Sequence, residues 1–235
     1  MIIRIENLSK KYSGKVALDI DNLSIQPGER FGLVGNNGAG KTTLFSLLLD
    51  LIRPTSGVVW SKDTAVSDSD TWKNYTGSFI DESFLIGYLT TEEYFNFVGQ
   101  LYGKNPPDVA LFLEQFTDFF NGEILDSGKY IRNMSKGNKK KIGIAAALLG
   151  EPELIILDEP FANLDPSSQI RLKSLIRELP PELTVLISSH DLAHVTEVCQ
   201  RIVLLENGKV IRDIKDAPER TLEELEAYFA GEEIS

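Results

Sequence analysis

Cysteine, long hydrophobic runs and a secretion signal are scarce or missing in this chain of 235 residues. Cys199 is the single cysteine, which excludes an intrachain disulfide and suits a reducing compartment. The longest apolar stretch, 142–149, falls far short of the ~20 residues that a membrane-spanning helix needs. The N-terminus, Met1-Ile2-Ile3-Arg4, lacks the charged, apolar and small-residue zones of a secretion signal. We therefore expect a soluble, intracellular protein.

Positive charge is also scarce. The 24 Lys and Arg residues stand against 35 Asp and Glu residues, which gives a formal net charge of -11, and no sustained basic block occurs. This balance argues against nucleic-acid binding through a general positive field. The hydrophobic content of 42% and the charged content of 25% are ordinary for a globular protein, and the length suits one domain with or without a subdomain.

The most informative motif is a phosphate-binding loop that reads GxxxxGK[ST]. It lies between a predicted strand, 30–34, and a predicted helix, 43–49. Its residues are Gly35, Asn36, Asn37, Gly38, Ala39, Gly40, Lys41, Thr42 and Thr43. Glycines let the loop turn its N–H groups toward a polyphosphate, and the helix start adds donors and a positive dipole end.

Two side chains of this loop have expected roles. Lys41 can reach the outer phosphates, and the Thr42 hydroxyl can ligate Mg²⁺. A glycine-rich turn that only caps a helix would not require the Gly-Lys-Thr triplet. The motif therefore predicts binding of ATP or GTP.

Hydrophobic patterns predict strands on both sides of a helical segment. Strand signals lie at 2–5, 17–20, 30–34, 58–60, 154–157, 184–187 and 201–205, whereas 61–78 carries no assignable pattern. Helical signals lie at 43–49, 90–101, 106–120, 137–149, 167–178 and 191–199, and a further helix is expected from Thr221. The aromatic residues of 106–120 are expected to form the core of a helical subdomain. We expect an α/β protein with a mostly parallel sheet core, an N-terminal antiparallel β subdomain and an inserted helical subdomain.

A second group of polar residues follows the later strands. Asp158 ends the apolar run 154–157 and can hold Mg²⁺ through its water shell, and Glu159 can accept a proton from an attacking water. Acidic residues also end strands simply because they meet solvent, but four apolar residues followed by Asp-Glu, downstream of a phosphate loop, favour the functional interpretation. His190 follows the next strand, so Glu159 and His190 are expected to approach the same γ-phosphate.

The order of the motifs along the chain resembles the ATP-binding cassette (ABC) ATPases over nearly the whole sequence. After the phosphate loop come Met134-Ser135-Lys136-Gly137-Asn138, Leu157-Asp158-Glu159-Pro160, Asn163-Leu164-Asp165 and Ser189-His190-Asp191. The segment 134–138 is similar to the family signature Leu-Ser-Gly-Gly-Gln, with Ser135 and Gly137 kept.

The resemblance implies a P-loop (RecA-like) fold and a set of ligand contacts. Tyr12 matches the aromatic that stacks on adenine, and Asp165 is expected among the nucleotide-contacting residues. Ser135 and Gly137 would contact the γ-phosphate of an ATP held by a second subunit, so that two ATP molecules lie in a head-to-tail dimer. ATP and Mg²⁺ are the implied cofactors.

Three lysines follow the signature segment. Lys139, Lys140 and Lys141 crowd the start of the predicted helix, where each exposed positive charge opposes the helix dipole by about 0.3–1 kcal/mol. An anion docking at that helix start would relieve the conflict. The alternative is three solvated lysines on an outer face, and it applies to Lys140 and Lys141 in particular.

One position departs from the family pattern. The family usually has a Gln where the first core strand leads into the helical insert, and here Asp81 stands at that place. A carboxylate can ligate Mg²⁺ but cannot donate a hydrogen bond as an amide does; Glu82 is the alternative. Asp81 and Lys136 resemble the bacitracin-type and ABC-2 exporter branches, which implies outward transport.

These features predict one ABC ATPase domain over 1–235, with the α/β core and β subdomain in 1–85 and 151–235 and the helical subdomain in 86–150. The expected function is the ATPase subunit of a transporter, working as a homodimer or heterodimer on a separate integral-membrane permease. Such a subunit is cytoplasmic and peripheral on the inner face of the membrane.

Two rival functions are kept open. A soluble ABC-type ATPase of translation or DNA repair usually carries two cassettes or a long coiled-coil insertion, and this chain has one cassette and no heptad run. A regulatory cassette that binds ATP without hydrolysing it is disfavoured by Glu159 and His190.

Overall fold

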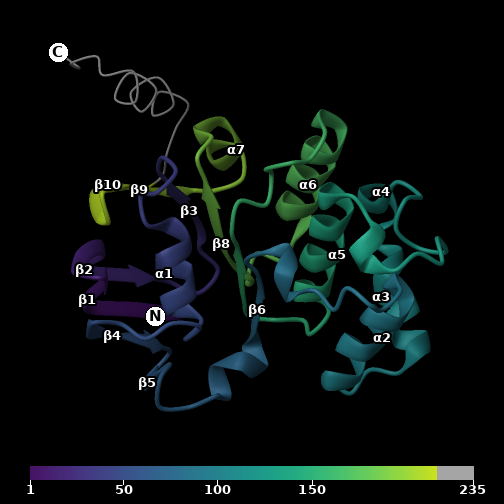
Figure 1. The fold of residues 1–235 in the computed structure, drawn as a ribbon, viewed down its shortest axis with the longest axis horizontal. Helices are drawn as coiled ribbons and strands as arrows, with labels where there is room; N and C mark the ends of the chain where they lie inside the picture. Colours follow the sequence, from purple (N-terminus) through teal and green to yellow (C-terminus); the bar gives the residue numbers. More distant parts are fainter. Residues whose placement is uncertain (216–235) are drawn as a thin grey trace.

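The computed structural model describes residues 1–215 as two β-sheets with helices around them (Figure 1). The strands are β1 (Ile3–Tyr12), β2 (Lys15–Ile25), β3 (Arg30–Val34), β4 (Ser56–Ser61), β5 (Thr64–Ala65), β6 (Thr76–Phe79), β7 (Leu154–Leu157), β8 (Thr184–Ser189), β9 (Arg201–Glu206) and β10 (Lys209–Lys215). The α-helices are α1 (Lys41–Leu48), α2 (Thr91–Leu101), α3 (Pro106–Glu114), α4 (Thr117–Phe120), α5 (Lys136–Leu148), α6 (Pro166–Glu178) and α7 (Leu192–Thr196). Short 3-10 helices are η1 (Thr71–Tyr75), η2 (Glu82–Phe84) and η3 (Ile131–Asn133). The helix expected from Thr221 lies outside the described residues.

The smaller sheet has the strand order β2-β1-β4-β5, and its pairs are antiparallel. Strands β1 and β2 form a hairpin whose turn residues, Ser13 and Gly14, both have positive φ, as a two-residue hairpin of right-handed twist requires. The N-terminal antiparallel sheet expected from the sequence is therefore confirmed.

The larger sheet has the strand order β10-β9-β3-β8-β7-β6. Strands β9, β3, β8, β7 and β6 pair in parallel, and only β10 at one edge is antiparallel. Every residue of β7 and β8 is buried, which explains their continuous apolar runs. The predicted mostly parallel α/β core is confirmed.

Helix α1 lies between the two sheets (Figure 1). Its buried side chains Leu44 and Phe45 share a core with Ile5 of β1 and Phe31 of β3. A second core cluster joins the opposite face of the larger sheet to the helices α2–α7. Within residues 1–215, no helix has the length and apolar composition to cross a bilayer.

Helices α2 to α5 stand between β6 and β7 in the sequence and lie together on the right of Figure 1. Their core is aromatic, as predicted: Phe116 stacks on Phe120 at a centroid distance of 5.6 Å, and Phe95 lies 6.1 Å from Phe120. The capping box of Thr90 and Glu93 at the start of α2 is also present. How these segments divide into subdomains remains a prediction.

The single helix expected over 106–120 is wrong, because the chain breaks between α3 and α4. Phe116 has φ -98° and ψ 4°, and the Thr117 hydroxyl donates to the Glu114 carbonyl oxygen at 2.7 Å. The break turns Phe116 and Phe119 into the core, where both are buried, whereas Leu111 of α3 is exposed. Helix α7 is also shorter than the expected 191–199, because the Val198 N–H donates to the carbonyl oxygen of Val195, three residues back instead of the four of an α-helix.

Truncation of the aromatic core should be costly. Phe116→Ala is expected to lower the free energy of unfolding by about 3–5 kcal/mol, because it leaves a cavity among rings that cannot collapse fully. Phe97→Ala, on the 43% exposed residue of α2, is the matched control and should cost less than ~1 kcal/mol. Urea unfolding of both variants measures the difference, and equal losses would contradict the assignment of Phe116 to the core.

Candidate active site

The phosphate-binding loop follows β3 and is held between two other strands. Gly38 and Gly40 have φ of 84° and 111°, in the left-handed region that favours glycine. A Cβ on Gly35 would lie 2.3 Å from the Leu205 carbonyl oxygen of β9, and one on Gly40 would lie 2.8 Å from the Ala17 carbonyl oxygen of β2. The glycines of the motif are therefore required by both conformation and close packing.

The loop ends at the start of α1, where the helix has free donors. Gly40 is the N-terminal cap and supplies no side-chain hydrogen bond to the first turn. The unpaired N–H groups and the dipole of that end favour an anion. A cavity of about 200 Å³ opens here, lined by Ala17, Asn37, Gly38, Gly40, Lys41, Thr42, Thr43 and Glu159. Most of the loop residues expected to bind phosphate therefore surround one cavity.

Lys41 is buried beneath this cavity, with 6% of its surface exposed. Its ammonium donates to the Gly35 carbonyl oxygen at 2.6 Å and lies 3.2 Å from Glu159 Oε1. A lysine held by backbone carbonyls at the loop mouth is placed to turn toward a phosphate.

Thr42 and Asp158 form the second part of the site. The Thr42 hydroxyl donates to Asp158 Oδ2 at 2.5 Å, which joins α1 to the end of β7. The Ser188 hydroxyl of β8 donates to the other oxygen, Asp158 Oδ1. Burial raises the pKa of Asp158, and the hydrogen bonds from Ser188 and Thr42 oppose that rise.

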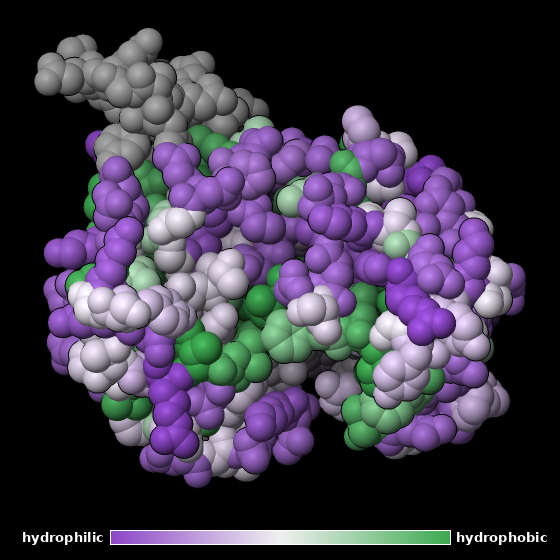
Figure 2. All heavy atoms as spheres, viewed as in Figure 1, coloured by the Kyte–Doolittle hydropathy of each residue, from purple (hydrophilic) through white to green (hydrophobic). Residues whose placement is uncertain are grey.

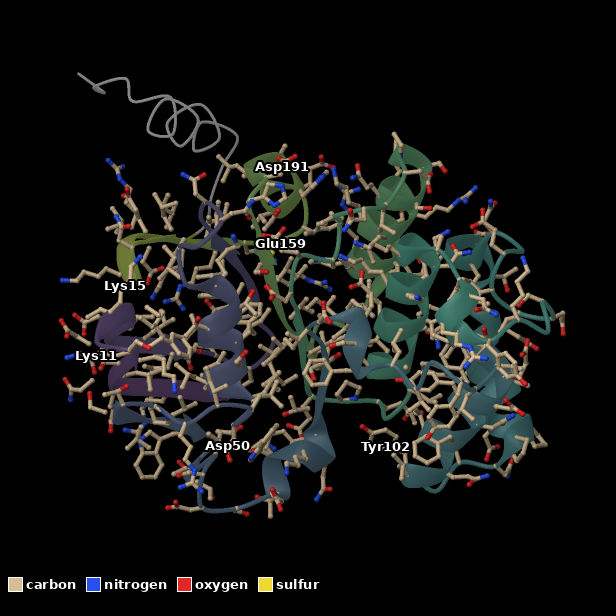
Figure 3. The ribbon with its side chains drawn as sticks, viewed as in Figure 1. Lys11, Lys15, Asp50, Tyr102, Glu159 and Asp191 are labelled. Carbon is tan, nitrogen blue, oxygen red and sulfur yellow. The ribbon has the colours of Figure 1, made fainter. Side chains whose placement is uncertain are left out.

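Glu159 and His190 form the third part and face each other across the ends of β7 and β8. His190 Nδ1 lies 2.8 Å from Glu159 Oε2, and Glu159 sits at the centre of Figure 3, below Asp191. Glu159 Oε1 is buried and, among residues 1–215, is ion-paired with Lys41 but accepts no hydrogen bond. The backbone of Glu159 has φ 46°, an unusual conformation that costs a non-glycine residue on the order of 1–3 kcal/mol. Such strain collects at functional positions.

Asp81 lies beside these carboxylates. A cavity of about 560 Å³ is shared by Asp81, Glu82, Asp158, Glu159 and Thr42. The Ser83 N–H donates to Asp81 Oδ1 at 2.8 Å, and hydrogen bonds from Ser83 lower the pKa of Asp81. Asp81 is therefore ionised and shares the cavity with the expected metal ligands.

The lysines of α5 are placed differently from the expectation. Lys140 and Lys141 are 5% and 2% exposed, so their placement as solvated side chains on an outer face is wrong. Lys140 donates to the Glu159 carbonyl oxygen at 2.6 Å, and the Lys141 ammonium lies 3.8 Å from Glu123 and over the Phe119 ring. Lys139 donates to the Arg132 carbonyl oxygen at 3.0 Å. Each of the three ammonium groups has a partner within the chain, so no external anion is required to offset their conflict with the helix dipole.

Four predicted nucleotide contacts lie away from the phosphate cavity. Tyr12 ends β1, where it is 48% exposed with the Lys10 ammonium 5.0 Å from its ring centroid. Ser135 caps α5 by accepting from the Asn138 N–H at 3.1 Å, and Gly137 is in the first turn of that helix. Asp165 caps α6 by accepting from the Ser168 N–H at 3.0 Å. Their roles toward a nucleotide remain predictions.

Ser188 and Lys140 are residues of the site that sequence reasoning missed. The Ser188 hydroxyl donates to Asp158 and also accepts from the Glu159 N–H at 2.9 Å, so it contacts both acidic residues. Its position at the end of β8, beside His190, could have drawn attention to it. Nothing in the sequence distinguishes Lys140 from its lysine neighbours.

The burial of Asp158 gives a stability prediction. A carboxyl whose pKa is higher in the folded state binds its proton more tightly there, so its ionisation lowers stability as the pH rises above the unfolded pKa. Asp158→Asn should therefore raise the melting temperature of the ligand-free protein at pH 7.5. The difference should shrink as the pH falls toward 4 and wild-type Asp158 takes up its proton.

Asp21→Asn, on an exposed position of β2, is the control and should not shift the melting temperature. Differential scanning calorimetry across pH measures both variants. A lower melting temperature for Asp158→Asn at pH 7.5 would contradict the predicted sign.

The chain is similar to known proteins over most of its length. Residues 18–162 match the family described as ABC transporter. The chain is 33% identical over 234 residues to a probable sulfate/thiosulfate import ATP-binding protein of Chlorella vulgaris, covering 94% of this chain and 96% of that protein. It is 34% identical to an uncharacterized ABC transporter ATP-binding protein of Nostoc sp., covering 83% of this chain and 59% of that longer protein.

Solved structures agree in fold. A dimeric ATP-binding cassette in a post-hydrolysis state, bound to ADP and Pi, superposes with a TM-score of 0.80 at 23% identity over 92% of this chain and 99% of that one. The cbiO1 subunit from Clostridium perfringens, part of the ABC transporter complex cbiONQ, superposes with a TM-score of 0.75 at 28% identity, over 96% of this chain and 90% of that one. The chain belongs to the ABC transporter family as an ATP-binding subunit, and it is an ATPase.

Proposed function

We propose that this ATPase subunit drives a separate membrane permease through ATP-dependent dimerisation. The observation that carries this proposal is a groove that opens beside the active-site cavity. Groove and cavity share Leu51, Phe79, Ile80 and Phe84 as lining residues. A partner bound in the groove would therefore touch the same segment that carries Asp81 toward the metal site.

Mg²⁺ fits the oxygen donors of the cavity. Among residues 1–215, no group of three or more His, Cys, Asp or Glu side chains could hold a metal ion alone. Mg²⁺ is usually bound by one or two carboxylates together with substrate phosphates and water, so such a group is not needed. Thr42 and Asp158 would hold the ion, with Asp81 as a further carboxylate ligand. When bound, Mg²⁺ neutralises charge that develops on the phosphates.

Glu159 is the proposed general base of hydrolysis. Its buried Oε1 is ion-paired with Lys41 at 3.2 Å, so a move of Lys41 toward the phosphates would leave that oxygen able to accept a proton from water. Lys41, 3.2 Å from Oε1, would move to the phosphates when ATP enters, and His190 would hold Glu159 Oε2 and sense the γ-phosphate. In this arrangement Glu159 would accept the proton, Lys41 would neutralise charge on the phosphates, and His190 would orient Glu159.

Replacement of the proposed base gives a direct test. Glu159→Gln removes the proton acceptor and keeps the shape, so turnover is expected to fall by ~10²–10⁴ while ATP-driven dimers accumulate. Phosphate release and size-exclusion chromatography measure the two effects. Glu178→Gln, at the exposed end of α6, is the control and should hydrolyse ATP at the wild-type rate. Normal turnover in Glu159→Gln would refute the assigned role.

The remaining predicted contacts are proposed to act in the dimer. Tyr12 would stack on adenine, and Ser135, Gly137 and Asp165 would meet the ATP held by the partner subunit. Two features support this arrangement: Ser135 and Gly137 lie at the start of α5, and the similar cassette bound to ADP and Pi is itself dimeric. The signature helix then completes the other subunit's site.

The groove beside the active site is the proposed docking face for the permease. Figure 2 shows apolar residues gathered across the middle of the face, between the core and the helices α2–α5. The walls include Phe84, Leu85 and Tyr102, of which Phe84 is 61% and Tyr102 is 41% exposed. In Figure 3, Asp50 and Tyr102 lie on opposite sides of the lower edge of this face. Large exposed apolar residues in one groove are typical of a partner site.

The similar cbiO1 subunit is part of a transporter complex, which supports a permease as the partner. This partner would hold the chain at the cytoplasmic face of a membrane. Asp81 and Lys136, which resemble the exporter branches, support outward transport.

A charge placed in the groove should weaken binding of the permease with little effect on ATP hydrolysis. Phe84→Asp is expected to reduce recovery of the permease with the affinity-tagged ATPase by tenfold or more, because a buried carboxylate without a partner opposes docking. ATP hydrolysis by the isolated subunit should change less than ~threefold. Leu111→Asp, on the 67% exposed residue of α3, is the matched control and should leave recovery unchanged. Equal recovery with both variants would argue against this groove.

A further inference from the structure

Lys140 is a buried cation at the junction between α5 and the active site. Only 5% of its surface is exposed, and it lines the same cavity as Asp81, Asp158 and Glu159. Burial lowers its pKa, whereas four carboxylates raise it, those of Glu82, Glu159, Asp158 and Asp81. An ammonium group is expensive to bury unless charges and hydrogen bonds compensate it. The four carboxylates offset only part of this cost, because burial is the larger effect and the pKa of Lys140 is lowered overall.

Within residues 1–215, the Lys140 ammonium donates one hydrogen bond, which goes to the backbone of the proposed base. Its Nζ donates to the Glu159 carbonyl oxygen at 2.6 Å, and the Ala162 N–H donates to the same oxygen at 3.2 Å. On the other side of the residue, the Glu159 N–H donates to Ser188 Oγ at 2.9 Å. Glu159 is therefore fixed at both of its peptide groups.

This double attachment bears on the direction of the Glu159 side chain. With φ at 46°, Glu159 has a backbone conformation that a non-glycine residue keeps only when its surroundings impose it. From that backbone, its carboxylate reaches His190 Nδ1 at 2.8 Å and lies 3.2 Å from Lys41 Nζ. Without the hydrogen bond to its carbonyl oxygen, the Glu159 backbone would be free to relax from this φ, and a change of φ would swing the carboxylate away from these partners.

We propose that Lys140 is a positioning residue that holds the backbone of Glu159 so that its carboxylate faces the attacking water. This inference rests on the role of general base proposed for Glu159. Lys140 acts within its own chain: it joins α5, whose start carries Ser135 and Gly137, to the base that serves the ATP bound by the same chain. The positive charge also offsets Asp81, which stands where the family usually has a neutral amide.

The test compares two lysines with the same kind of contact. Lys140→Met removes the charge and the donor but keeps an unbranched apolar stem. Lys139→Met is the matched control, because Lys139 is the preceding residue of α5 and its Nζ also donates to a backbone carbonyl, that of Arg132. Both full-length variants and Glu159→Gln are assayed for kcat, KM for ATP, and ATP affinity in EDTA.

If Lys140 positions the base, its replacement should lower kcat without changing the affinity for ATP. Lys140→Met should lower kcat by ~tenfold or more, since small misplacement of a catalytic group costs up to ~10²-fold, with ATP affinity in EDTA within ~twofold of wild type. Lys139→Met should match wild type in each quantity. Hydrogen exchange of the nucleotide-free protein gives a readout independent of turnover: the Ala162 amide should exchange several times faster in Lys140→Met only.

Three outcomes would overturn the inference, and they are distinguishable. If Glu159→Gln is inactive but Lys140→Met keeps a wild-type kcat, Lys140 does not position the base. If Lys140→Met loses ATP affinity as much as kcat, its role is structural. If Glu159→Gln turns over normally, the proposed general base fails, and the inference about Lys140 fails with it.

Discussion

The register of three buried parallel strands is the constraint on which the site depends. Val34 of β3 pairs with Ser189 of β8, and Leu157 of β7 pairs with Ile187. The three strands therefore end almost in step, and the segments that leave their carboxyl ends emerge at one edge of the sheet. That edge receives the phosphate loop from β3, the acidic pair from β7 and the histidine from β8. Because every residue of β7 and β8 is buried, a slip in pairing would break the core.

Much of this could be predicted from the sequence, because the chemistry follows strand ends. The glycine pattern of the loop needs a strand before it and a helix after it, and Asp158 and His190 each follow an apolar run. Ser188 was missed because a serine that follows an apolar run at the end of a strand looks like an ordinary polar residue. Its role depends on β7 lying next to β8, which is a tertiary fact.

Lys140 and the break between α3 and α4 could not be predicted for the same reason, because both depend on tertiary packing. Lysine is normally exposed, so three lysines in succession indicate side chains in solvent. Only the packing of α5 against the end of β7 shows that Lys140 is buried. The aromatic residues of 106–120 recur at helical spacing up to residue 120, which predicted a single helix. The helix breaks before α4 because Phe116 and Phe119 both pack into one core. The local sequence pattern predicts which helices and strands form, and tertiary packing decides the residues at which they end.

In the proposed dimer, one helix would serve two nucleotides. The start of α5 would contact the ATP of the partner subunit, and Lys140, one turn further on, would hold the base for the ATP of its own subunit. A shift of α5 on loss of the partner's γ-phosphate would therefore reach the second site through one rigid element. Cooperativity between the two ATP sites would then need no relay through the membrane, because each cassette carries the connection in its own signature helix.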